Sequence, residues 1–143
     1  HDISATNNLI KTTLDSMKGY KEASEDSETT NSAFFCAMAD ERSAVASQLQ
    51  QHVTSLGGDP EDDSSISGAA HRGFMDLKQA VMGTDEKAIV QEVERGEDYI
   101  KNKFQEALQD NDLSDQTRQQ ITNCFQSIEQ GHARVDAMKS QMS

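Results

Sequence analysis

Proline and tryptophan are almost missing from this sequence. It has one proline, no tryptophan and 5% aromatic residues among its 143 residues. The β-branched residues that favour strands are sparse, whereas Ala, Gln, Glu, Lys and Asp are plentiful. Because proline interrupts helices and most of the abundant residues favour them, this composition predicts an all-α protein. The length suits one domain, and regularly spaced Leu, Ile, Val, Met and Phe indicate that it has a hydrophobic core.

Cysteine and long apolar runs are scarce as well. Cys36 and Cys124 lie far apart and form no C-x-x-C pair, so the sequence has no disulfide framework. Reduced thiols in a cytoplasmic protein are the default interpretation of such a pattern. No apolar run approaches the roughly 20 residues of a membrane span, and no signal-peptide pattern opens the chain. We therefore expect a cytoplasmic protein without a membrane span.

Positive charge is in short supply. The chain has 13 Lys and Arg against 25 Asp and Glu, which gives a formal net charge of −12. Phosphate backbones and anionic membranes repel such a surface, so the sequence argues against nucleic acid as a partner. Solubility is the simpler explanation of the acidity. The sequence also lacks a Gly-rich phosphate loop and any Ser–His–Asp or Cys–His set.

Apolar residues recur at helical spacing over five stretches, at about residues 3–25, 32–56, 66–82, 85–110 and 114–140. Gly57-Gly58 provides a stop signal after the second stretch, and Ser114 is the candidate N-cap of the last. The stretch 66–82 is short and amphipathic. Its apolar stripe includes Phe74 and Leu77, so we expect it to pack across the other four helices.

The connections predict how these helices are arranged. The first two long helices have a short joint, as do the last two, so each pair should form an antiparallel hairpin. Residues 58–84 form a long connection that can return the chain along the bundle, so the second and third long helices should run parallel. Two hairpins joined in this way have the ferritin-like topology. We therefore expect one domain over residues 1–143, an all-α, ferritin-like four-helix bundle whose crossover contains a short fifth helix.

The stretch FQSIEQGHARVDAM contains Glu129-x-x-His132, a spacing that holds metal in di-iron bundles. Such a centre needs one Glu from each of two helices and Glu-x-x-His from each of the other two. Here Glu97 and Glu41 lie near the apolar stripes, but the residue three after Glu41 is alanine, and Met17 occupies the mid-stripe position of the first helix. The candidate metal ligands are therefore Glu97, Glu129, His132 and Glu41, a degenerate site for iron or another divalent metal.

Arg42 gives these residues a second interpretation. It lies on the apolar stripe of its helix, where a guanidinium needs a buried partner such as Glu97 or Glu129. Tyr20 either joins this polar core layer or reaches solvent from its rim. Glycines stand immediately before both Glu97 and His132, which indicates close helix packing. On this interpretation His132 lies inside the bundle near Glu97, within reach of Arg42 or Tyr20, and the layer satisfies its charges without metal.

Four stretches of the sequence carry a resemblance: KGYKEASED, LGGDPEDDSSISGAAHRGFMDLKQAVMG, VERGEDYIKNKFQEAL and HARVDAMK. Together they resemble the small bacterial ferritin-like four-helix-bundle proteins of an uncharacterised domain family, over nearly the whole chain. The resemblance implies a ferritin-like bundle in the bacterial cytoplasm and no particular activity. Members commonly have a carboxylate where Met17 stands here, which argues further against a full di-metal centre. Ferritins and rubrerythrins of the wider superfamily do carry di-iron sites, but a shared fold does not fix function.

Three functional hypotheses follow. The favoured one is a non-enzymatic bundle with a degenerate metal site, whose role is structural or stress-related and exerted through self-association into a homo-oligomer. The second is a metal-binding protein or di-iron-type oxidase that uses Glu97, Glu129 and His132. The third is a protein-interaction module whose surface includes Phe74, Met75 and Met82.

Overall fold

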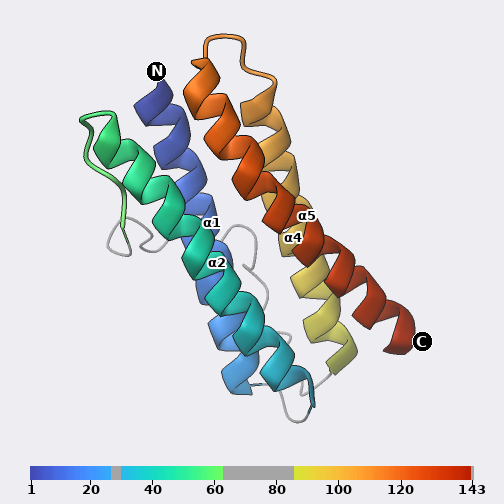
Figure 1. Cartoon of the computed structure of the whole chain (residues 1–143). Helices are drawn as coiled ribbons and strands as arrows, with labels where there is room; N and C mark the ends of the chain where they lie inside the picture. Colours follow the sequence, from blue (N-terminus) through green and yellow to red (C-terminus); the bar gives the residue numbers. More distant parts are fainter. Residues whose placement is uncertain (27–29, 63–85, 143) are drawn as a thin grey trace.

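The computed structural model describes residues 1–26, 30–62 and 86–142. Within these ranges the protein has four α-helices and no strand: α1 Asp2–Asp26, α2 Thr30–Ser55, α4 Glu86–Leu108 and α5 Asp115–Met142. The helices lie together as a bundle (Figure 1), which confirms the all-α class. Their bounds lie within two residues of those expected for the four long helices. The expected helix at 66–82, with Phe74 and Leu77, lies outside the described residues.

Helices α1 and α2 form an antiparallel hairpin. The Ser32 hydroxyl, near the start of α2, donates a hydrogen bond to the carbonyl of Ser24, near the end of α1 (2.6 Å). At the other end of the hairpin, the Asn7 side chain of α1 donates to the carbonyl of Asp59, just after α2 (3.0 Å). The two pairs therefore fix the direction of the hairpin at both ends.

Helices α4 and α5 form the second antiparallel hairpin. Lys139, near the end of α5, pairs with Glu94 in the first half of α4 at 2.8 Å. Arg118, near the start of α5, donates through its guanidinium to the carbonyl of Leu108, the last residue of α4. This second contact satisfies a carbonyl that a helix end leaves without an intrahelical partner.

The direction of α4 relative to α2 follows from α5. Glu41 in the first half of α2 meets Arg134 late in α5, whereas His52 near the end of α2 meets Thr117 at the start of α5. Helix α5 is thus antiparallel to both α2 and α4, and α2 and α4 run in the same direction (Figure 1). The connection lengths predicted this parallel arrangement. The end of α2 and the start of α4 consequently lie at opposite ends of the bundle.

Two glycines end α2. Gly57 has a φ of 85°, a left-handed conformation that glycine adopts without a steric penalty. Its N–H donates to the carbonyl of Thr54, and the N–H of Gly58 donates to that of Val53, both at 3.0 Å. This pair of bonds is a Schellman motif, which satisfies two carbonyls at the helix end. The stop signal predicted at Gly57-Gly58 is therefore confirmed.

Each helix turns one stripe of mostly aliphatic side chains toward the centre of the bundle. The buried members of these four aliphatic stripes include Ile10, Leu14 and Met17 of α1, Met38, Val45 and Leu49 of α2, Ile89, Val93, Ile100 and Phe104 of α4, and Ile121, Ile128 and Val135 of α5. Burying one side chain of this size stabilises a protein by about 1.5–3 kcal/mol. The stripes therefore supply most of the driving force for assembly. No helix in the described ranges is long and apolar enough to cross a membrane.

Candidate functional site

The aliphatic stripes are interrupted at one level of the bundle. On α2, Arg42 lies between Met38 and Val45, and on α4, Glu97 lies between Val93 and Ile100. Arg42 and Glu97 are both completely buried, with a relative exposure of 0%. Charged residues are rarely buried to this extent unless they are paired. This level of the bundle is therefore the leading candidate for a functional site.

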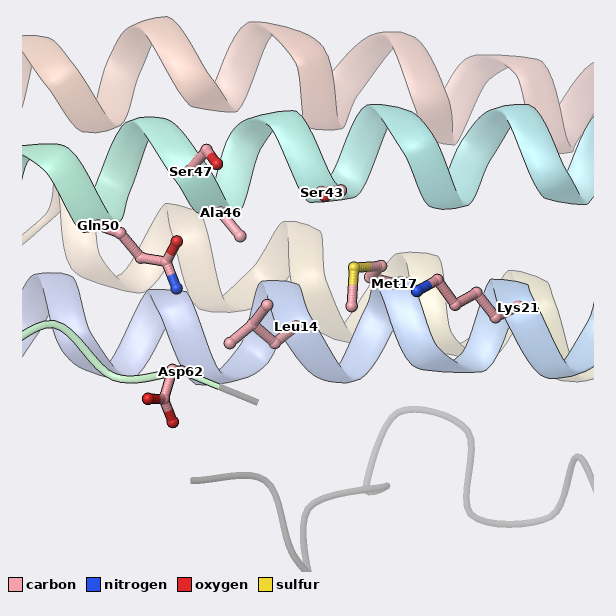
Figure 2. A pocket seen from close by; sticks show the side chains of 8 residues that line it. All are labelled: Leu14, Met17, Lys21, Ser43, Ala46, Ser47, Gln50 and Asp62. Atoms are coloured by element: carbon pink, nitrogen blue, oxygen red, sulfur yellow. The ribbon is translucent and has the colours of Figure 1, made fainter. Parts of the chain in front are cut away.

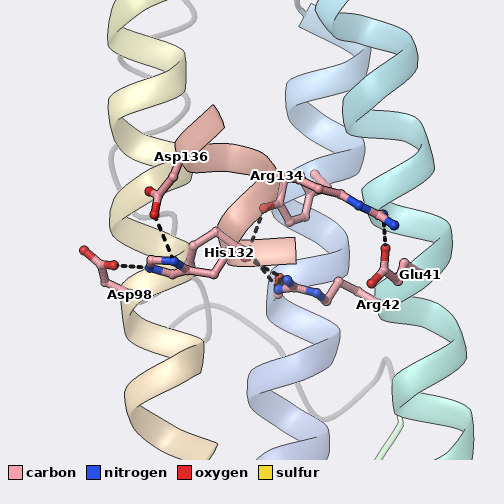
Figure 3. A network of polar contacts seen from close by, with 9 residues as sticks. Glu41, Arg42, Asp98, His132, Arg134 and Asp136 are labelled. Carbon is pink, nitrogen blue, oxygen red and sulfur yellow. Dashed lines mark hydrogen bonds and ion pairs between the residues drawn. The ribbon is translucent and has the colours of Figure 1, made fainter. Parts of the chain in front are cut away.

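Arg42 and Glu97 form a bidentate ion pair. The Arg42 Nη1 and Nη2 groups donate to Oε2 and Oε1 of Glu97, each at 2.8 Å. Nη1 also donates to the hydroxyl of Ser16 on α1 at 2.9 Å. The Tyr20 hydroxyl, from the next turn of α1, donates to Glu97 Oε2 at 2.6 Å. We call Ser16, Tyr20, Arg42 and Glu97 the central polar layer; Figure 3 shows Arg42 at this level of the bundle.

The surroundings of the central polar layer fix its protonation. Burial opposes the charge on Arg42, but the charge and hydrogen bonds of Glu97, together with the influence of Tyr20 and Glu41, outweigh burial and raise the pKa of the guanidinium. Burial, followed by the negative charge of Glu97, raises the pKa of the Tyr20 hydroxyl well above its ordinary value. Arg42 is therefore a permanent cation and Tyr20 a permanent hydrogen-bond donor. Tyr20 also receives the guanidinium over its ring, with 5.6 Å between the Arg42 Cζ and the ring centroid.

Helix α5 contributes a glycine to the same level. A Cβ atom added to Gly131 would stand 2.4 Å from Arg42 Nη2 and 2.8 Å from Met38 Cε, closer than real Cβ contacts come. Gly131 thus lets the backbone of α5 pass directly over the guanidinium. All four described helices therefore meet at the central polar layer, three through side chains and α5 through its backbone.

The remaining predicted ligands lie elsewhere. Glu41 points away from the core and accepts a hydrogen bond from Arg134 of α5 at 2.8 Å (Figure 3). Glu129 is exposed. His132 does not lie inside the bundle near Glu97, so that expectation is wrong. It lies half-buried between α4 and α5, with Nε2 2.7 Å from Asp98 Oδ1 and Nδ1 3.3 Å from Asp136 Oδ2 (Figure 3).

The donor set at the centre does not fit a metal ion. Both oxygens of Glu97 already accept hydrogen bonds, three in all, and the Arg42 guanidinium lies where a cation bound to that carboxylate would lie. The other three candidate ligands face different surroundings, so the structure does not bring the four together. The part of the chain that the structure describes has one group of three potential ligands close enough to share an ion: His1, Asp110 and Asp112, with ligand atoms within 4.8 Å of one another. It lies at an end of the bundle, where α1 begins and α4 has ended.

Comparison with known proteins places the chain in a family. Residues 2–110 match the family described as "Domain of unknown function (DUF2383)". The chain belongs to the DUF2383 family. The matched range includes α1, α2 and α4, and with them the whole central polar layer, whereas Gly131 lies beyond it. No curated protein matched the sequence.

Some residues of this DUF2383 protein were not expected at the centre. Ser16 was missed because a serine that directly follows an aspartate, Asp15, resembles an ordinary helix-surface residue. The sequence indicates Gly131 only as a packing glycine, but it is Gly131 and not His132 that faces Arg42. A residue without a side chain adds nothing to an apolar stripe, so the pattern does not reveal this. Asp15, the neighbour of Ser16 on α1, is buried as well, with only 3% of its surface exposed.

A second polar cluster joins three helices at one end of this DUF2383 protein. The Thr117 hydroxyl donates to Asp2 at 2.9 Å and lies 2.7 Å from His52 Nε2. Because its only proton goes to Asp2, the Thr117 oxygen must accept from His52, so the histidine cannot act on it as a base. Ser114 also joins the cluster, donating its N–H to Asp2 and capping α5 through its hydroxyl. The cluster therefore connects α1, α2 and α5 by hydrogen bonds and is not a nucleophilic site.

An open groove of about 510 Å³ lies between α1 and α2 (Figure 2). It is lined by Leu14, Met17 and Lys21 of α1, by Ser43, Ala46, Ser47 and Gln50 of α2, and by Asp62. Its lining contains hydroxyls but no histidine or thiol that could activate them. Of the two thiols, Cys124 is buried and burial raises its pKa to about 11, so it is not a nucleophile at neutral pH. The described residues therefore show no catalytic constellation.

Proposed function

We propose that this member of the DUF2383 family is a non-enzymatic, ferritin-like bundle. In it, the Arg42 guanidinium provides the positive charge that metal ions provide in a di-iron bundle. The observation that carries the proposal is the buried Arg42–Glu97 pair, with both carboxylate oxygens engaged at 2.8 Å by one guanidinium. A buried carboxylate needs a compensating positive charge. In a di-iron bundle the metal ions provide it, whereas here the chain supplies it from α2.

The ferritin-like part of the proposal is supported by helix direction. An up-down-up-down bundle would place α4 antiparallel to α2, but these helices run parallel (Figure 1). Parallel second and third helices are what two hairpins with a long crossover produce. We retain the proposal that the connection includes a short helix over residues 66–82, for which the sequence pattern is the support.

Without a catalytic constellation in the described residues, a role through association is the best-supported biological function. We propose self-association of the bundle, in a bacterial cytoplasmic and stress-related setting for which the family resemblance is the only support. Sedimentation equilibrium at several protein concentrations tests the first part. We expect a mass that rises above that of one chain, and a monomer at every concentration would contradict self-association.

Metal titration tests the replacement of the metal centre. Tag-free protein is titrated with Fe(II) under anaerobic conditions, and oxygen is then admitted. The matched control carries Asp110→Asn and Asp112→Asn, which removes the carboxylates of the surface group with His1. We expect at most one weak equivalent in the parent protein, and we expect the control to lose it.

A metal centre in the bundle would give a different result in this titration. Two equivalents per chain that persist in the control, together with a ferroxidase signal abolished by Glu97→Ala, would show a di-iron centre and overturn the proposal. One equivalent that persists in the control and is lost in His132→Ala would instead favour a mononuclear site.

A further inference from the structure

The central polar layer is the one level at which every described helix departs from its aliphatic stripe. The departures are Ser16 and Tyr20 on α1, Arg42 on α2, Glu97 on α4 and Gly131 on α5. Above and below them the stripes consist mainly of aliphatic residues that resemble one another. Sliding one hairpin along the other by a helical turn would exchange one aliphatic contact for a similar one. The aliphatic stripes alone therefore specify the register between the hairpins only weakly.

The charged groups respond very differently to such a slide. Helix α4 belongs to one hairpin and presents Glu97, whereas α1 and α2 belong to the other and present Tyr20 and Arg42. Moving α4 by one turn would set Val93 or Ile100 against the guanidinium and leave two buried charges without partners. Removing one partner of a buried pair is among the most destabilising changes a core can undergo. Gly131 adds a steric condition, because any residue with a side chain placed over Arg42 would collide with it.

We infer that the central polar layer is a register lock, a device that selects one alignment of the α1–α2 hairpin against the α4–α5 hairpin. A single buried polar residue fixes alignment and partner number in coiled coils in the same way. Replacing a buried ion pair by apolar residues of similar size is often neutral or stabilising. The lock therefore contributes to the choice of alignment rather than to the strength of packing. This inference does not depend on the proposed function.

The experiment measures the alignment directly. Spin labels are attached at Gln51→Cys on α2 and Gln91→Cys on α4, both exposed positions, in a Cys36→Ser background that removes the exposed native thiol. The pair is separated along the bundle axis, so a slide of α4 changes the distance between the labels. The parent protein should give one narrow distance distribution.

The first variant removes the lock. It replaces the layer with apolar residues: Ser16→Ala, Tyr20→Phe, Arg42→Met and Glu97→Leu. We expect it to remain folded, with a Tm equal to or above that of the parent. Its distance distribution should split or broaden by about one helical turn, about 5.4 Å. The matched control, Glu41→Leu with Arg134→Met, removes the exposed pair beside the layer and should keep the narrow distribution.

The second variant moves the lock. In Val93→Glu with Glu97→Val the carboxylate is four residues earlier on α4, so pairing with Arg42 requires the α4–α5 hairpin to advance by four residues, about 6 Å. Because α5 is antiparallel to α4, this slide would bring the buried Val135 over Arg42 in place of Gly131. The variant therefore also carries Gly131→Val and Val135→Gly, which keeps a glycine over the guanidinium. Since α2 and α4 are parallel, the labels at 51 and 91 should come closer by several ångström. A narrow parent-like distance in the apolar variant would overturn the inference. Failure of the apolar variant to fold would also overturn it, because the layer would then supply stability instead of alignment.

Discussion

Two arginine–glutamate pairs stand side by side in this protein, and they begin at consecutive residues of α2. Glu41 pairs with Arg134 and Arg42 pairs with Glu97, each with a closest contact of 2.8 Å. The first pair is 22% and 54% exposed, whereas the second is 0% and 1% exposed. Distance therefore does not distinguish them, but burial does. Water screens the outer pair, so removing one of its partners should cost little stability. Removing one partner of the inner pair would leave an unpaired charge in the core, which is costly.

The largest expected effect is on the inner pair. Glu97→Ala leaves the Arg42 guanidinium buried without its carboxylate, so we expect the free energy of unfolding to fall by about 3–5 kcal/mol. Urea denaturation followed by circular dichroism measures this change. A loss below about 1 kcal/mol, the level of an exposed pair, would remove the distinction between the two pairs.

A smaller loss is expected where α5 crosses the inner pair. The added methyl group of Gly131→Ala would meet Arg42 Nη2, which donates a hydrogen bond to Glu97. Nη1 of the same guanidinium donates to Ser16 and Glu97, so the group cannot move aside without losing hydrogen bonds. Overpacking of this kind costs about 1–3 kcal/mol, and we expect it to exceed the gain of about 1 kcal/mol from replacing a helical glycine. Thermal unfolding of this variant is compared with that of Gln130→Ala, an exposed neighbour. A variant more stable than the parent would show that the Arg42 side chain moves away from the added methyl group at little cost in free energy.

The outer pair should matter less. We expect Glu41→Ala to cost about 0.2–1 kcal/mol, and the difference from the parent should shrink as salt is added because the pair is reached by solvent. Denaturation curves at low and high salt provide the test. A cost comparable with that of Glu97→Ala, or one insensitive to salt, would mean that Glu41 acts through more than Arg134.

The smallest effect concerns pH at the end of the bundle. Hydrogen bonds from Ser114, and then from Thr117, lower the pKa of Asp2 below its ordinary value. A carboxylate with a lowered pKa stabilises the fold above its unfolded pKa and loses this contribution as the pH falls through its folded pKa. The Tm difference between the parent and Asp2→Ala should thus be constant near neutral pH and shrink in acid. The exposed Asp40→Ala is the control, and a difference that grows in acid would contradict the assignment.

Much of the fold could be read from sequence because helices and their ends depend on nearby residues. The Gly57-Gly58 stop of α2 and the Ser114 cap of α5 are local features, and both are present. The parallel direction of α2 and α4 followed from a physical constraint, since a short connection forces antiparallel neighbours and a long one does not. These inferences needed no knowledge of distant contacts.

The site was harder to predict because it depends on how each helix is rotated about its axis. Arg42 and Glu97 could be anticipated, since each interrupts an aliphatic stripe and a buried charge requires a partner. The position of His132 could not, because residues 131 and 132 differ by about 100° on a helix and either one could face the core. A glycine gives no hydrophobic signal, so only its contact with Arg42 reveals that Gly131 faces the core.

The burial of Tyr20 also gives the protein a built-in optical probe. The chain has two tyrosines and no tryptophan, and Tyr20 is held in the core between the Phe35 ring, the Arg42 guanidinium and Glu97. An aromatic ring fixed in asymmetric surroundings produces a near-ultraviolet circular dichroism signal, and that signal vanishes when the ring is freed. In a Tyr99→Phe background, the tyrosine band would come from Tyr20 alone. The state of the bundle centre could then be followed in unlabelled protein, without a metal or a dye.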